Sequence, residues 1–246
     1  MSQRLSRKEI KRDEFMESVG GAFEFLQHHA GKLLMAAAAV LVGLMIAGLI
    51  ITHSKRQERR AGEALSAAVK VMQAEIDPVA ADPDDETQPT FATAAARTVR
   101  VKNLLTALGE EFGGTDAAAI AAAYLGQLAA DEGDMAAARS HWEAYLDRSS
   151  GNSLAVEVAL NLMALDRAEG RGDALVTSLR ARLSASEDDL PRDLLWYELA
   201  LTLDALGREA EAIEAYQRLL EDHPQSAFAS DARRRTGSSV PPLFGS

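Results

Sequence analysis

The first pattern in the chain is a long uncharged run near the N-terminus. Residues 33–51 read LLMAAAAVLVGLMIAGLII, nineteen residues without a charge. A helix of that length covers about 28 Å, close to the roughly 30 Å hydrocarbon thickness of a bilayer. The run is longer than a signal-peptide core, and it ends in basic residues instead of a cleavage site. The pattern therefore predicts an uncleaved transmembrane helix over residues 33–52.

The charges beside this run leave its orientation open. Four basic residues follow it within residues 55–60, whereas Lys32 alone stands directly before it. The short N-terminal segment adds five more basic residues, and long domains cross membranes largely regardless of charge. The balance favours residues 1–32 as a cytoplasmic tail, with the larger C-terminal part on the other side of the membrane.

Three small residues, Ala39, Gly43 and Ala47, recur every fourth position within the run. This spacing allows membrane helices to approach each other closely. It also arises by chance in a segment rich in Ala and Gly, so helix packing and simple composition remain alternatives.

The segment over residues 53–90 is expected to form a helical neck and an acidic loop. Apolar residues recur at helical spacing from Ala61 to Ile76, and no proline occurs before Pro78. Residues 77–89 then combine three prolines with five acidic side chains. A calcium loop needs Gly and Glu in register, which are missing here, so a solvated loop is expected.

From residue 91 onward the chain predicts paired helices. A helix is expected from Phe91 to Phe112, ended by two glycines. Three further glycines, Gly133, Gly170 and Gly207, are spaced by 37 residues and lie between predicted helices. Residues 91–235 therefore read as a helical repeat domain, and residues 236–246 as a disordered tail.

The unit over residues 193–224 resembles the tetratricopeptide repeat, a helix–turn–helix motif of 34 residues. Nine of its residues fall on the signature positions of that motif: Trp196, Leu199, Ala200, Leu203, Gly207, Ala212, Tyr216, Leu219 and Pro224. Residues 119–152 keep the same pattern of signature positions. Residues 156–187 match the motif only in the type of residue at those positions. The resemblance implies an all-α fold, with the transmembrane helix followed by a tetratricopeptide-repeat-like array, an α-solenoid.

Charge and composition exclude several classes of function. The formal net charge is −11, which divides into +4 for residues 1–60 and −15 for the remainder. Such an acidic body disfavours nucleic acid as a partner. The absence of cysteine removes disulfides and thiolate metal sites, and the five histidines show no metal-binding spacing. With no nucleophile or nucleotide-binding motif either, no enzyme, metal or cofactor is expected.

The resemblance to tetratricopeptide repeats implies a peptide-binding groove lined by the first helix of each unit. On the positions of that motif, the partner-binding candidates are Gln127, Leu160, Ala164, Leu194, Tyr197 and Leu201. The alternative is that Leu160, Tyr197 and Leu201 belong to the core between repeats.

One membrane helix, a helical neck and a short repeat array resemble the ancillary subunit family of the bacterial Sec translocon. This layout implies a single-pass protein of the inner membrane with a periplasmic repeat domain, where a scaffold assists translocation or chaperoning. Its partners would be a translocon, chaperone or client protein, and the lipid bilayer, with homo- or hetero-oligomers possible. The alternatives are a structural subunit assembled through the anchor helix, or a protein similar to the periplasmic coordinators of envelope division.

Overall fold

The computed structural model describes residues 7–85, 87–149 and 151–237, with side chains at Met35 and from Val40 onward. The chain divides into two compact units, residues 1–57 and 58–246. In the first unit the described residues belong to helix α1, which has the bounds Arg7–Met72. Within this helix the side chains of residues 40–56 are all exposed. Because residues 40–51 are almost entirely apolar, this stretch of helix is apolar on every side.

The predicted transmembrane helix lies within α1, and part of it has no described side chains. In the portion of the chain that the structure describes, no helix is long and apolar enough to cross a membrane. The predicted span of residues 33–52 includes residues 33, 34 and 36–39, whose side chains are not described.

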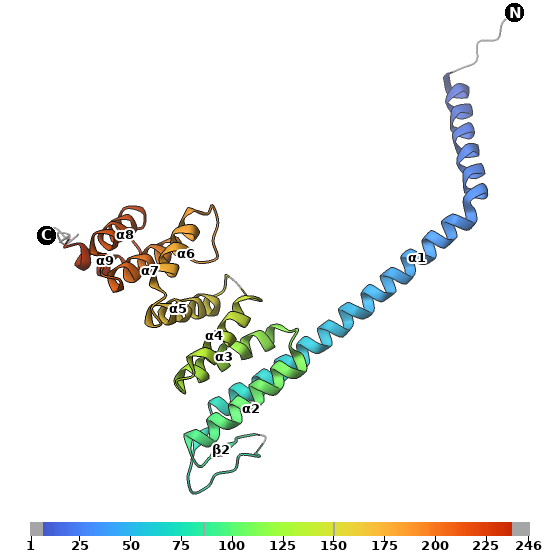
Figure 1. The fold of residues 1–246 in the computed structure, drawn as a ribbon. Helices are drawn as coiled ribbons and strands as arrows, with labels where there is room; N and C mark the ends of the chain where they lie inside the picture. Colours follow the sequence, from blue (N-terminus) through green and yellow to red (C-terminus); the bar gives the residue numbers. More distant parts are fainter. Residues whose placement is uncertain (1–6, 86, 150, 238–246) are drawn as a thin grey trace, which may run out of the picture. The chain divides into compact units, whose positions relative to one another are not determined.

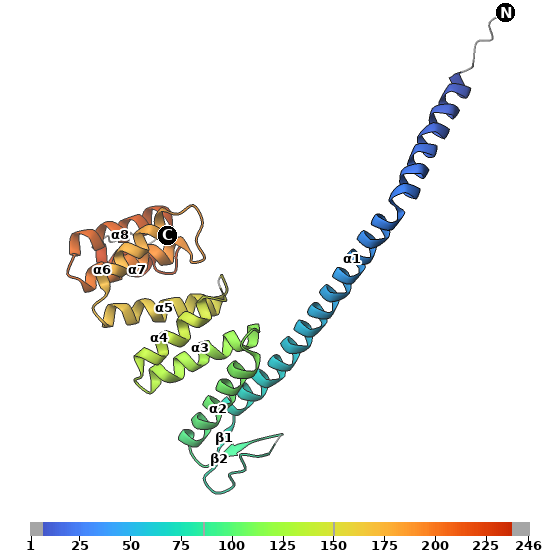
Figure 2. The ribbon, with the colours of Figure 1, turned by 45° about the vertical axis from the view of Figure 1, so that its right-hand side comes forward.

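The second unit begins with the last turns of α1, which lie beside α2 (Ala94–Phe112) (Figures 1 and 2). Small residues of α1, among them Ala61 and Ala68, are fully buried in a cluster with Leu105 and Leu108 of α2. Small side chains bring the two helices close together, and the larger leucines fill the space between them. Thr93 caps α2, since its Oγ1 accepts a hydrogen bond from the Ala96 N–H at 3.1 Å.

The segment between these helices corrects two predicted boundaries. α1 ends at Met72 instead of Ile76, and α2 begins at Ala94 instead of Phe91. The intervening residues form two short parallel strands, β1 (Glu75–Ile76) and β2 (Thr90–Phe91). Pro78 disfavours helix at the residue before it, and the Asp77 N–H donates to the Phe91 carbonyl at 2.9 Å. Ile76 fitted the apolar stripe by spacing, but it is exposed, whereas Phe91 is buried.

Helices α3 (Asp116–Asp131) and α4 (Met135–Leu146) form the first helical hairpin. Gly126 is the point of close approach, because a Cβ added there would lie 2.5 Å from the Trp142 ring. The turn passes through Gly133, which has a φ of 82°. Gly170 and Gly207 have the same left-handed conformation, so all three regularly spaced glycines lie in turns between helices, as predicted.

Helix α5 (Ser153–Ala168) contributes to two hydrophobic clusters. Ala155 and Val158 pack with α3 and α4, whereas Ala159 and Met163 pack with the helices that follow. α6 (Gly172–Ser184) packs against α7 (Arg192–Ala205). α5 therefore joins the first hairpin to the second half of the array.

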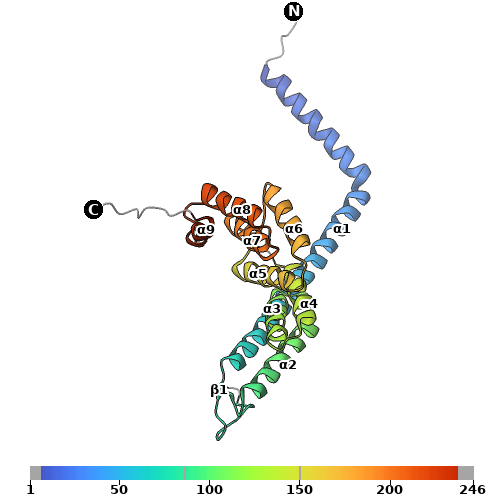
Figure 3. The same cartoon turned by 60° about the vertical axis from the view of Figure 1, so that its left-hand side comes forward.

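Helices α7 and α8 (Glu209–Asp222) form a further helical hairpin. Ala200 and Ala212, predicted at the helix crossing, are both fully buried. A further helix, α9 (Ala229–Thr236), lies beside α8 (Figure 3). The predicted tail of residues 236–246 lies outside the described residues from residue 238 onward.

Candidate protein-binding surface

The predicted partner-binding residues lie on three helices. Gln127 is on α3, Leu160 and Ala164 are on α5, and the other three are on α7. Each is the first helix of a hairpin or repeat unit, the helix expected to line the binding face.

The structure brings α5 and α7 into contact with each other. A charged pair joins them, because Arg167 Nη1 of α5 lies 2.5 Å from Glu198 Oε2 of α7. Beside this contact Leu160 and Leu201 are half-buried and Ala164 is exposed. Neighbouring helices thus present partly accessible apolar side chains, as a protein-binding surface requires. We call Leu160, Ala164 and Leu201 the α5–α7 strip.

Gln127 does not belong to this strip. It is exposed on α3, which packs against α2 and α4. Its Nε2 donates to Asp131 Oδ1 at 2.8 Å, so its amide is engaged within its own helix.

Tyr197 is covered by the segment that leads into α9. Its ring stacks on Phe228 with 4.5 Å between centroids and 15° between planes. Its hydroxyl donates to Asp231 Oδ2 at 2.8 Å. Burial, followed by this hydrogen bond to a carboxylate, raises the pKa of Tyr197 above its usual range. Leu194 is only 4% exposed. Leu194 is therefore buried, whereas Tyr197 is half-buried and keeps part of its side chain accessible.

Sequence reasoning missed α9 and its contacts with α7. The signals for this helix are present: Ala229 and Ala232 have helical spacing, residues 233–235 are basic, and Gly237 follows. The helix has only eight residues and a very polar composition, so its apolar periodicity is weak. The structure nevertheless buries both alanines.

Ion pairs connect successive units around the array. Arg139 of α4 lies 2.7 Å from Asp166 of α5 and 3.2 Å from Glu169. Arg171 pairs with the same two carboxylates. These acidic groups therefore hold neighbouring elements together, and their charge is already compensated within the chain.

Of the residues predicted to pack a membrane helix, Gly43 and Ala47 are exposed on α1. The Ala39 side chain lies outside the described residues. Elsewhere, no group of three or more His, Asp or Glu among the described residues is arranged to hold a metal ion.

Comparison with known proteins identifies one repeat directly. Residues 195–226, from α7 through α8 to the turn before α9, match the tetratricopeptide repeat family. No curated protein and no solved structure matches the chain. The chain therefore contains a tetratricopeptide repeat within a helical array, an architecture whose usual role is to bind other proteins.

Proposed function

We propose that this protein is a membrane-tethered scaffold that holds segments of partner proteins on the face formed by α5 and α7. The observation that carries the proposal is the α5–α7 strip, where apolar side chains remain accessible beside a recognised tetratricopeptide repeat. Repeat arrays of this kind bind extended or helical peptides along one face.

The strip favours an apolar partner segment. Leu160, Ala164 and Leu201 offer apolar contact area, while the adjacent Arg167 is held by Glu198. A partner contact here needs no new charge compensation, and burying apolar surface supplies the binding energy. Leu194 is buried, and Tyr197 is partly covered by Phe228 and Asp231, so the three residues of the strip provide most of this surface.

The tether would be the apolar segment of α1. Residues 33–51 carry no charge, and the described side chains of residues 40–51 are exposed on all sides of the helix. A helix that is apolar all round needs an apolar environment on every side. By resemblance of layout, we place the protein in the bacterial inner membrane with its repeats in the periplasm, where it assists translocation or chaperoning.

Site-specific photocrosslinking in cells tests the strip. A photoreactive amino acid at position 201 or 164 should give the same discrete adducts, because both positions face one partner segment. The matched control is position 99, since Val99 is 59% exposed on α2, away from the strip. Equal adducts at all three positions, or none at 164 and 201, would remove the strip from the proposal.

Reporter fusions test the tether and its orientation. Fused to the C-terminus, an enzyme active only outside the cytoplasm should be active, whereas one active only in the cytoplasm should be silent. Deleting residues 33–52 should release the protein from membranes washed with alkaline carbonate. The opposite reporter pattern would reverse the orientation, and a full chain that washes off would refute the tether.

A further inference from the structure

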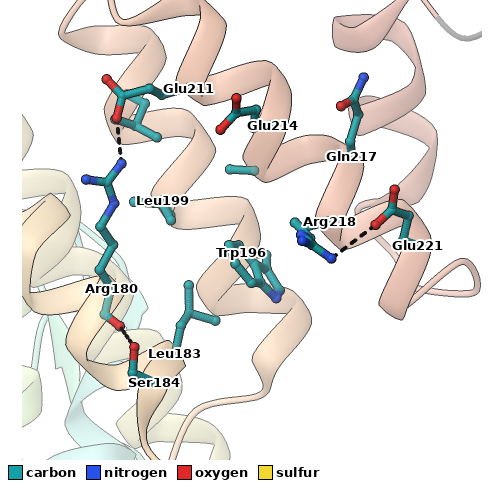
Figure 4. A pocket seen from close by; sticks show the side chains of 12 residues that line it. Arg180, Leu183, Ser184, Trp196, Leu199, Glu211, Glu214, Gln217, Arg218 and Glu221 are labelled. Carbon is teal, nitrogen blue, oxygen red and sulfur yellow. Dashed lines mark hydrogen bonds and ion pairs between the residues drawn. The ribbon is translucent and has the colours of Figure 1, made fainter.

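An accessible pocket lies between α6, α7 and α8 (Figure 4). Its volume is about 590 Å³. Leu183 of α6 and Trp196, Leu199 and Leu203 of α7 line it with apolar surface, and charged side chains of α6 and α8 surround them.

This pocket is on a different face of α7 from the α5–α7 strip. At 3.6 residues per turn, Trp196, Leu199 and Leu203 fall on one side of the helix, and Leu201 falls nearly opposite. The two surfaces are therefore separate, and one can fail while the other binds.

Trp196, which lines the pocket, carries a hydrogen-bond donor without an acceptor among the described residues. The indole Nε1 of Trp196 is buried, and no described residue accepts its hydrogen. Buried polar groups in proteins are nearly always paired, so an unpaired N–H beside a pocket calls for an acceptor from outside the chain.

Glu214 is the uncompensated charge on the pocket's edge. At one end Arg180 pairs with Glu211 at 2.6 Å, and at the other Arg218 pairs with Glu221 at 3.4 Å. Arg208 also binds Glu211, and the guanidinium groups of Arg208 and Arg180 lower the pKa of Glu211 to about 2. Among the described residues no cation pairs with Glu214, which is exposed on α8 between these two pairs.

We propose that this pocket is a second protein-binding site, which takes an extended partner segment with an apolar side chain followed by Lys or Arg. The apolar side chain contacts Trp196 and the leucines, and the cation pairs with Glu214. A small turn of the indole ring exposes its buried N–H, and a backbone carbonyl of the segment then accepts that hydrogen. An extended segment fits because its carbonyls are free, whereas those inside a helix are already hydrogen-bonded. The acidic character of the chain after residue 60 favours the same basic partner.

The indole signals of the full chain in detergent micelles provide a direct test. The chain has two tryptophans, so labelling with 15N-tryptophan gives two indole N–H signals, which Trp142→Phe assigns. The probe is the blocked peptide acetyl-Gly-Leu-Pro-Leu-Lys-Gly-amide. It should shift the Trp196 signal downfield and slow its hydrogen exchange, while the Trp142 signal stays in place.

Variants separate the two parts of recognition. Trp196→Phe keeps an aromatic ring but loses the N–H donor and part of the apolar area, so the peptide should bind about 2–10-fold more weakly. Glu214→Lys should weaken peptide binding by about 2–5-fold, and replacing the peptide's Lys by Glu should have the same effect. The control Glu110→Lys makes the same charge change at an exposed position of α2 and should bind like the parent protein.

Two results would overturn this site: a Trp196 signal that the peptide leaves unmoved, or Glu214→Lys binding like Glu110→Lys. The second comparison remains valid if Trp196→Phe fails to fold, since both glutamates are exposed. Leu201→Glu, which alters only the α5–α7 strip, should bind the peptide normally, so failure of one surface is distinguishable from failure of the other.

Discussion

At the scale of single residues, small side chains at helix crossings determine how closely the helices pack. Ala200 and Ala212 are fully buried in the α7–α8 hairpin, and Gly126 accommodates the Trp142 ring in the α3–α4 hairpin. Interiors packed this tightly have little room for added atoms. Adding a single methyl group at these positions should therefore be costly.

Gly126→Ala is expected to destabilise the protein by about 1–3 kcal/mol, because its Cβ would lie 2.5 Å from the Trp142 ring. Gly109→Ala in α2 is the matched control. Nothing lies within 4 Å of a Cβ at that position, so the substitution should stabilise by about 0.5–1 kcal/mol. Urea unfolding measures both variants. Equal effects would contradict the close approach of α3 and α4.

Two tyrosines predict a loss of stability in alkali. Burial and carboxylate partners raise the pKa of both Tyr197 and Tyr216 in the folded protein. The unfolded chain therefore releases these protons first, at about pH 10. The stability they confer is complete below that pH and is lost as the pH rises toward their folded-state pKa values.

Tyr216→Phe should reduce the slope of the unfolding free energy against pH between pH 10 and 12. Tyr124→Phe, which leaves both tyrosine–aspartate hydrogen bonds intact, should keep the parent slope. Equal slopes in the two variants would show that Tyr216 does not contribute to the pH dependence.

The repeat motif predicted the packing positions directly, whereas it left Tyr197 open between a binding face and the core between repeats. Spacing alone placed Ala200 and Ala212 at the crossing, because a repeat motif specifies which residues must be small. Tyr197 contacts Phe228 and Asp231 from a segment about 30 residues further along the chain. Such a contact depends on how α9 folds back, and no local periodicity encodes that.

At the scale of elements, one buried ion pair joins α5 to α7. The Glu198 side chain is 7% exposed, and Arg167 is its cation. Removing one member leaves a buried charge without a partner, whereas removing both leaves none.

Arg167→Met should therefore destabilise the protein by about 3 kcal/mol. The double variant Arg167→Met, Glu198→Met should regain most of that loss, because apolar side chains of similar size fill the same space. Thermal unfolding of the parent, both single variants and the double variant forms a complete cycle. A double variant as unstable as the sum of the single ones would mean that the pair is not coupled.

The helices were predictable where repeated patterns agree, and not where short-range chemistry decides. Regularly spaced glycines predict three turns, and the structure has a left-handed glycine at each of them. Periodicity failed at Ile76, where Pro78 and the pairing of β1 with β2 override the apolar stripe. It also failed at α9, because only two small residues of that helix face the interior.

At the scale of the whole molecule, the proposed scaffold and a structural subunit assembled through α1 make opposite predictions. A scaffold that binds partners through its repeats should lose its complexes when residues 91–224 are deleted. A structural subunit assembled through α1 should keep them. Native gel electrophoresis of gently solubilised membranes, with the protein tagged at its N-terminus, distinguishes the two. Complexes that survive the deletion unchanged would refute the scaffold.

The position of helix α5 limits which segments of the gene can be exchanged by recombination. Its two sides complete two different cores, so neither half of the array is self-sufficient without it. A gene fragment that starts at α6 would encode an interior lacking Ala159 and Met163, and one that stops at α4 would leave Trp142 and Tyr145 without Val158. Recombination that exchanges single repeats would therefore produce less stable proteins. We expect the segment from α3 to α9 to be inherited as a whole.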